Sequence, residues 1–157
     1  SDAHVEKNNP NEVLLDCYIA LPVNSLVRKK VYDLVGEFDE TYRAAQDHDM
    51  LIRIAEVTEL AYFPDFLWYY RRHDDSISSK QQSLRWRYGF TILKNAKYRY
   101  PYKSRTIRKR LAVLNYRLGM CSLGEQKQLV ALWYMVKAFV LDPVRAISVI
   151  TGFEKRN

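Results

Sequence analysis

Short apolar runs alternate with polar breaks through the first half of the chain, and this pattern predicts a few short strands. Residues 25–28, 60–63 and 66–70 are short and apolar or aromatic, so each range predicts a strand. The last two ranges are separated by Pro-Asp, which predicts a turn between them. Residues 13–23 are also apolar, and they predict either a short buried strand or the end of a helix.

Two short helices are expected among these strands. Residues 29–35 place their apolar side chains on one side and are followed by Gly36, a residue typical of helix ends. Apolar residues recur at helical spacing after Asp47, so a second helix is predicted to begin near that residue. Strands and helices in this order predict an α/β fold, seen as α+β in isolation, with a partial sheet of few strands and flanking helices.

The pattern after Ser79 is helical to the end of the chain. Between Ile107 and Cys121 the apolar positions step alternately by four and three residues, which makes a continuous stripe along one helix. A second helix is predicted over residues 125–141 and a third over residues 143–150, so a helical bundle is expected over residues 80–157. The side chains expected to face inward from the second helix are Leu129, Leu132, Trp133, Val136 and Val140.

Composition limits the class of protein. With 157 residues, of which 48% are apolar and 27% charged, the chain is long enough for one domain, or one and a half, with its own core. Cys17 and Cys121 lie far apart and outside any CxxC motif, which excludes a disulfide scaffold and a zinc ribbon and fits a reducing compartment. No apolar run reaches the roughly 18 residues that a membrane helix needs. The expected location is the cytoplasm, with peripheral attachment to a membrane left open.

Charge divides the chain in two. Residues 1–70 carry 6 Lys/Arg and 13 Asp/Glu, whereas residues 71–157 carry 19 and 5. The range 79–117 holds 12 basic residues and no acidic one, with aromatic residues interleaved. Three interpretations remain open: a solvated helical face, contact of residues 80–117 with an anionic membrane or a lipid-linked phosphate, or nucleic-acid binding, which is the least favoured.

Four short motifs follow one another between residues 26 and 78. They are Arg28 after a short apolar run, Gly-x-Phe-Asp at 36–39, Gln-Asp-His-Asp at 46–49, and Tyr-Arg-x-His at 70–73 before a Ser-rich turn. In this order the motifs resemble the C-terminal half of family 2 glycosyltransferases, which are inverting enzymes with the GT-A fold. The resemblance covers about a third of the chain.

The resemblance implies a fragment of an enzyme that moves a sugar from a nucleotide-sugar donor to an acceptor hydroxyl, in polysaccharide or lipid-linked glycan synthesis. Residues 1–79 would be the acceptor-side half of a GT-A catalytic domain, and residues 80–157 a basic helical extension. The nucleotide-binding half is not expected within this sequence, so the fragment alone is expected to be inactive. A divalent metal, Mg or Mn, would belong to the full-length enzyme. An unpaired sheet edge would favour a homo-oligomer.

Asp47 is the candidate catalytic residue. In an inverting transfer the acceptor hydroxyl loses its proton as it attacks, so a carboxylate must lie within hydrogen-bonding distance as general base. Asp47 is at the predicted loop–helix junction, and the resemblance places the family's base there. The alternative is that Asp47 only caps the helix. Two neighbours depart from the family: Gln46 stands where Glu is frequent, and His48 stands where an aromatic residue is common, which would change the acceptor pocket.

The resemblance also implies substrate-binding residues near this base. Asp47 and Asp49 have the Asp-x-Asp spacing of a metal site, but a helix follows them, so an ion pair of Asp49 with Arg53 is preferred. His73 would approach the diphosphate, and its neutral imidazole suits a transition metal such as manganese. The substrate-binding candidates are Gln46, Asp49, Arg71, His73 and Ser76.

Two hypotheses without catalysis compete with this one. The first is a basic, aromatic module that binds nucleic acid or an anionic membrane surface, as the charge of the second half allows. The second is a helical interaction domain, since one helical pair resembles a single unit of a repeat protein.

Overall fold

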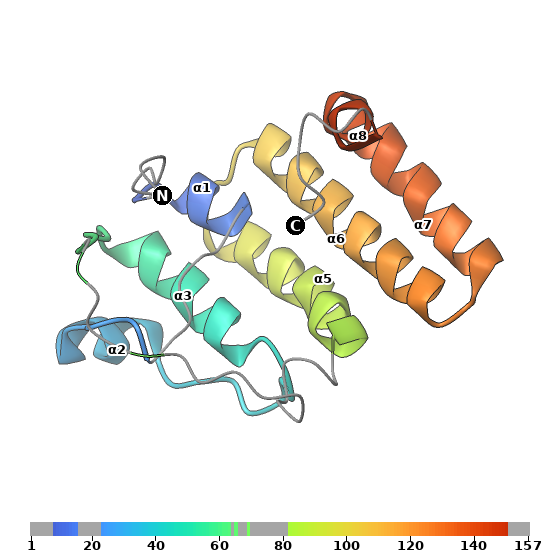
Figure 1. The fold of residues 1–157 in the computed structure, drawn as a ribbon. Helices are drawn as coiled ribbons and strands as arrows, with labels where there is room; N and C mark the ends of the chain where they lie inside the picture. Colours follow the sequence, from blue (N-terminus) through green and yellow to red (C-terminus); the bar gives the residue numbers. More distant parts are fainter. Residues whose placement is uncertain (1–7, 16–22, 64, 66–68, 70–81, 151–157) are drawn as a thin grey trace.

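The computed structural model describes residues 8–15, 23–63, 65, 69 and 82–150, and within these ranges the regular structure is helical (Figure 1). The helices are α1 (Pro10–Leu15), α2 (Lys29–Val35), α3 (Gln46–Val57), α5 (Gln82–Arg99), α6 (Ser104–Gly124), α7 (Gln128–Leu141) and α8 (Pro143–Ile150). The helices predicted over 29–35 and 143–150 are therefore confirmed, as is the end of the 107–121 helix at Gly124.

The predicted α/β fold with a partial GT-A sheet is wrong for the part of the chain that is described. Residues 25–28 and 60–63 were expected to be strands, and both are irregular. Of residues 13–23, the structure describes 13–15, which belong to α1, and a turn at residues 23–24. Of residues 66–70, it describes Tyr69 alone. A strand is stable only beside a hydrogen-bonded neighbour. The aromatic pair Tyr62-Phe63 therefore stays irregular and exposed, since the described part of the chain offers it no neighbouring strand.

Helix α6 lies between α5 and α7, and the three helices form one layer of the molecule (Figure 1). Close approach of α5 to α6 depends on Gly89, because a Cβ atom at this position would stand 2.5 Å from Cδ2 of the buried Leu114. Gly119 of α6 lies in the same way against the flexible side chain of Met135 on α7. Helix α8 packs on the end of α7.

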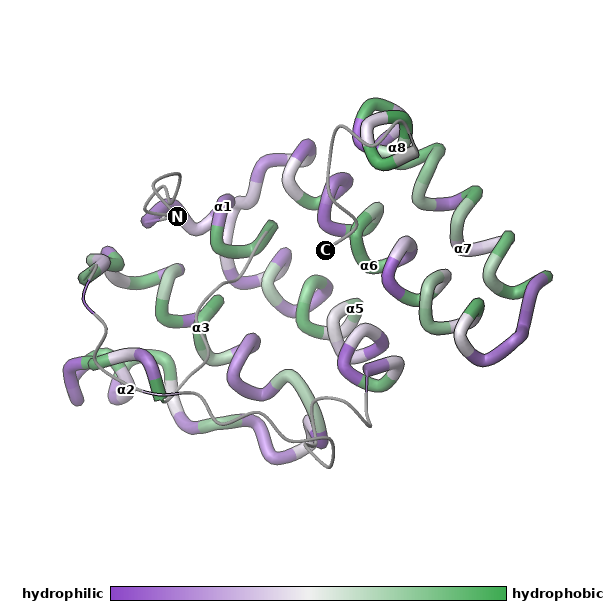
Figure 2. The backbone as a smooth tube through the Cα atoms, in the orientation of Figure 1, coloured by the Kyte–Doolittle hydropathy of each residue, from purple (hydrophilic) through white to green (hydrophobic). Residues whose placement is uncertain are grey.

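Helix α3 is at the centre of the remaining helices and is buried on most of its sides. One core cluster places Ile52 of α3 with Leu14 of α1 and with Ile92 and Leu114 of α5 and α6. A second cluster contains apolar side chains of α1, α2 and α3, around Met50. The green segments of α3 in Figure 2 show this apolar character. The proposed boundary at residue 79 lies outside the described residues, and the division into two units stays a prediction.

The face of α7 that was expected to point inward points outward. Its apolar side chains at positions 129, 132, 133, 136 and 140 have exposed fractions of 53–83%, whereas Ala131 and Ala138 are buried against α6. Almost every residue of α7 is apolar, so the hydrophobic period does not show which face packs. The small alanines allow the closer approach to α6, and this decides the orientation.

Candidate functional site

The N-terminus of α3 begins with a residue in the left-handed conformation. Ala45, which precedes the helix, has φ +66° and ψ +18°, and its methyl group is buried in the first core cluster. Such a conformation costs a non-glycine residue about 1–2 kcal/mol, and it occurs often at functional sites. The sharp turn leaves Gln46 exposed and Asp47 partly exposed at the corner.

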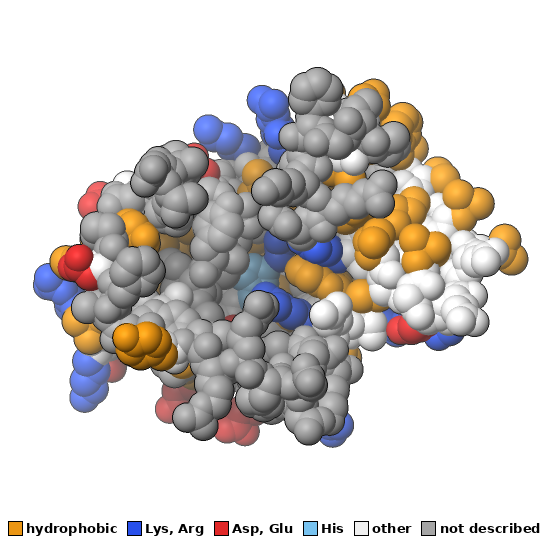
Figure 3. Space-filling view, viewed as in Figure 1, with side chains coloured by type: hydrophobic (Ala, Val, Ile, Leu, Met, Phe, Trp, Pro, Cys, Tyr) orange, Lys and Arg blue, Asp and Glu red, His pale blue; other side chains and the backbone are white. Residues whose placement is uncertain are grey.

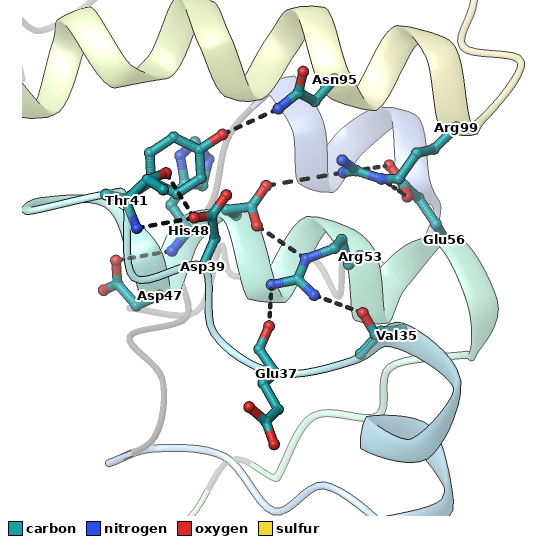
Figure 4. A network of polar contacts seen from close by, with 12 residues as sticks. Val35, Glu37, Asp39, Thr41, Asp47, His48, Arg53, Glu56, Asn95 and Arg99 are labelled. Atoms are coloured by element: carbon teal, nitrogen blue, oxygen red, sulfur yellow. Dashed lines mark hydrogen bonds and ion pairs between the residues drawn. The ribbon is translucent and has the colours of Figure 1, made fainter.

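Asp47 holds its carboxylate at this corner through one local contact. Its Oδ1 accepts a hydrogen bond from the backbone N–H of His48 at 2.8 Å. Asp47 makes no ion pair with any described residue, and in Figure 4 it lies apart from the contacts around Arg53. Ala45 occupies the cap position, so the interpretation of Asp47 as the N-cap is wrong. A carboxylate in the first turn is favourable because the helix N-terminus is partially positive.

Asp49 turns to the other side, into the protein. Its Oδ2 accepts a hydrogen bond from Nε of Arg53 at 2.9 Å, which confirms the ion pair predicted from their spacing, and its Oδ1 lies 4.0 Å from Nη2 of Arg99. Arg53 also donates to the carbonyl oxygens of Val35 and Glu37, at 2.6 and 2.9 Å (Figure 4). The buried carboxylate is thus neutralised, and the end of α2 is joined to α3.

The contacts of Arg99 extend to the other end of α3. Arg99 makes a bidentate pair with Glu56, with distances of 2.9 and 3.3 Å, and the hydroxyl of Tyr102 donates to the same carboxylate at 2.8 Å. Burial, with the Glu56 carboxylate beside it, raises the pKa of Tyr102 far above its usual range. These bonds fix α3 against the end of α5 and the turn before α6.

His48 is buried between α3 and α6 rather than facing an acceptor pocket. Nη2 of Arg110 lies 3.2 Å from Nε2 of His48, and Nη1 of Arg110 donates to the carbonyl oxygen of Leu15. An arginine only donates, so Nε2 must accept and the ring must be neutral. Burial lowers the pKa of His48 well below its usual value, and the charges of Arg110 and Arg85 add to this effect. His48 stands four residues before the apolar Ile52, and this helical spacing is a sequence signal that could have indicated its burial.

The loop before α3 is held in place by its own side chains. Oδ1 of Asp39 accepts hydrogen bonds from the Oγ1 and the backbone N–H of Thr41, at 2.6 and 2.9 Å, and these bonds lower the pKa of Asp39. Tyr42 is buried, and its hydroxyl accepts a hydrogen bond from Asn95 of α5 at 3.1 Å. Tyr88 packs edge-on against Tyr42 and donates to the Thr41 carbonyl at 3.3 Å. The loop therefore holds the corner at Asp47 against α5.

The structure places three of the predicted site residues on the first turn of α3. Gln46 and Asp47 share its exposed corner, whereas Asp49 is engaged inside with Arg53. Arg71, His73 and Ser76 lie outside the described residues. Among the residues that are described, no group of three or more His, Cys, Asp or Glu side chains could hold a metal ion. Within the described ranges, no helix is both long and apolar enough to cross a membrane.

Comparisons with protein-family models, with curated proteins and with solved structures found no match to this chain. The resemblance to family 2 glycosyltransferases is corrected by two findings. No family model matches the chain, and the described residues form helices where a GT-A sheet would need strands. The assignment to that family and to its fold is therefore not supported.

Proposed function

We propose that this chain carries the general base of an inverting sugar transfer, from a nucleotide-sugar donor to an acceptor hydroxyl, as part of a longer enzyme. The observation that carries the proposal is the position of Asp47. Its carboxylate lies at the exposed corner formed by Gln46 and Asp47. The residues before and after this corner, Ala45 and His48, are buried. A base held on a rigid element by buried neighbours is well suited to accept a proton in a fixed geometry.

The proposed step uses one displacement. The acceptor O–H bond breaks and its proton moves to the Asp47 carboxylate, while the acceptor oxygen forms a bond to the anomeric carbon. The bond from that carbon to the diphosphate oxygen breaks, and the nucleoside diphosphate leaves. Its developing charge requires cations, for which we propose Arg71 and a divalent ion, Mg or Mn, that the neutral imidazole of His73 would help to hold. Gln46 would contact the acceptor beside the base.

The test is the Asp47→Asn variant in the complete polypeptide encoded by the reading frame that contains this sequence. Release of nucleoside diphosphate is measured with a panel of nucleotide sugars, with saccharide and lipid-linked acceptors, and with Mg or Mn. We expect kcat to fall by about 10²–10⁴-fold with little change in donor KM. The matched control is Asp33→Asn, which removes an exposed carboxylate from α2 and should leave kcat unchanged.

Two results would count against the proposal. Turnover of Asp47→Asn equal to that of the unmodified protein would exclude the residue as the base. Release of no diphosphate from any donor by the complete polypeptide would exclude the reaction itself. A far-UV circular dichroism spectrum of each variant checks that the helices are retained.

A further inference from the structure

The outer surface of α7 is an apolar face that no described element covers. We define the α7 face as Leu129, Leu132, Trp133, Val136 and Val140, which lie at helical spacing along about 17 Å of the helix. All five side chains are more than half exposed. Figure 3 shows apolar side chains gathered over α7 and α8 on this side of the molecule. An exposed apolar patch of this kind marks a contact surface.

Cations and aromatic rings border the α7 face on one side. A groove of about 330 Å³ between α5, α6 and α7 is lined by Trp133, Tyr134, Lys137, Arg87 and Phe90, among others. Trp133 belongs to both the face and the groove, and Nζ of Lys137 lies 3.4 Å from the centre of its ring. Trp and Tyr rings with a lysine at the edge of an apolar surface suit the headgroup layer of a bilayer.

The charge of the surrounding helices selects among the possible occupants. Residues 82–149 contain 14 Lys/Arg and two Asp/Glu; of these cations, Arg110 is buried beside His48 and Arg99 is paired with Glu56. Symmetric pairing of this face with a second copy of the chain would bring two sets of mainly basic helices together, which is unfavourable. An anionic lipid surface would instead be attracted to the same charges.

We infer that the α7 face binds the surface of an anionic lipid bilayer, with α7 lying parallel to the membrane plane. The apolar side chains enter the headgroup–acyl boundary, while Lys137 and Arg87 remain at the level of the lipid phosphates. The inference moves the membrane contact from the basic stretch 80–117 to α7. It does not depend on the proposed sugar transfer, because neither Asp47 nor any other residue of that site takes part.

The experiment measures binding of the 157-residue chain to vesicles by co-sedimentation. Vesicles of phosphatidylcholine with about 30% phosphatidylglycerol are compared with pure phosphatidylcholine. The double variant Leu132→Asp/Val136→Asp should weaken binding to the anionic vesicles about tenfold or more. The matched control is Leu34→Asp/Val57→Asp, which makes the same charge change at two apolar residues of α2 and α3 with similar exposure, and it should bind much more tightly than the α7 variant.

A second measurement needs no charged substitution. Brominated lipids should quench the fluorescence of the bound protein, and this quenching should be clearly reduced in Trp133→Phe but kept in Trp86→Phe, since Trp86 packs against the first core cluster. Equal binding by the α7 double variant and its control would overturn the inference. Absence of binding to anionic vesicles would do the same. A dimer in sedimentation velocity that the α7 variant dissociates would assign the face to a second copy of the chain instead.

Discussion

The guanidinium of Arg53 lies against the carboxylate of Asp49, one turn earlier on α3, with Nε 2.9 Å from Oδ2. The same guanidinium donates to the carbonyl oxygens of Val35 and Glu37, which belong to the end of α2 and to the loop after it. A single side chain thus neutralises a buried carboxylate and satisfies two backbone acceptors. The orientation of α2 on α3 depends on these bonds.

Substitution of Arg53 should therefore destabilise the protein strongly. Arg53→Ala leaves the Asp49 carboxylate buried with only the more distant Arg99 nearby, and it leaves two carbonyl oxygens without their donor. We expect the free energy of unfolding in urea to fall by about 3–5 kcal/mol. The control is Lys127→Ala, which removes an exposed, solvent-screened ion pair with Glu125 and should change the same quantity far less. Similar losses in the two variants would contradict the role given to Arg53.

The buried His48 predicts loss of stability in acid. Its pKa in the folded protein is lowered below 6.5 by burial and by Arg110, so the unfolded chain takes up the proton more readily. The contribution of His48 is complete above about pH 6.5 and is lost as the pH falls towards the folded value. The variant His48→Gln stays neutral and can still accept from Arg110. The unfolding free energy of this variant, measured in urea between pH 7.5 and 5.5, should fall less steeply with decreasing pH than that of the unmodified protein. The two slopes should differ by up to about 1.4 kcal/mol per pH unit. Parallel curves would contradict the prediction.

Tyr102 predicts loss of stability in alkali. Burial, together with the adjacent Glu56 carboxylate, raises its pKa in the folded protein above the usual value of 10.0, so deprotonation favours the unfolded chain. Its contribution is present below about pH 10 and is lost as the pH rises above that value. Tyr102→Phe should therefore lose stability less steeply between pH 9.5 and 11, as followed by urea unfolding. Tyr98→Phe, which removes the hydroxyl of an exposed tyrosine, should follow the unmodified protein.

Replacing Gly89 by alanine should disturb the packing of α5 on α6, whereas the same replacement of Gly124 should not. In Gly89→Ala the new methyl group meets the buried Leu114, and overpacking of this kind costs about 1–3 kcal/mol, against a gain of about 1 kcal/mol in helix propensity. In Gly124→Ala nothing lies within 4 Å of the new Cβ atom, so only the gain remains. Thermal unfolding should place Gly89→Ala below the unmodified protein and Gly124→Ala at or above it. The reverse order would show that α5 and α6 are less closely packed.

The sequence predicted helices well where apolar and polar residues alternate clearly. The stripe from Ile107 to Cys121 is a part of α6, and its Leu114 and Leu118 are buried as expected. The pattern failed for α7, where almost all residues are apolar and two alanines decide the packed face. It also failed for the aromatic run at residues 60–63, because strand formation depends on a partner elsewhere in the chain rather than on local composition.

The candidate site could be predicted in part. The i, i+4 spacing of Asp49 and Arg53 is a local signal, and their ion pair followed from it. The contact between His48 and Arg110 joins residues 62 positions apart, and no local pattern indicates such a partner. The left-handed conformation of Ala45 is equally hidden, since alanine is a residue that normally avoids it.

The contacts that hold the loop before α3 in place should affect its cleavage by proteases. Residues 36–45 contain turns and an exposed Arg43, so they have the composition of a trypsin-sensitive site. A protease, however, must draw several residues into an extended conformation before it can cut. Arg53 holds the backbone at Glu37, and Tyr42 anchors it in the core a few residues later. The peptide bond after Arg43 should thus resist digestion until the helices around it come apart.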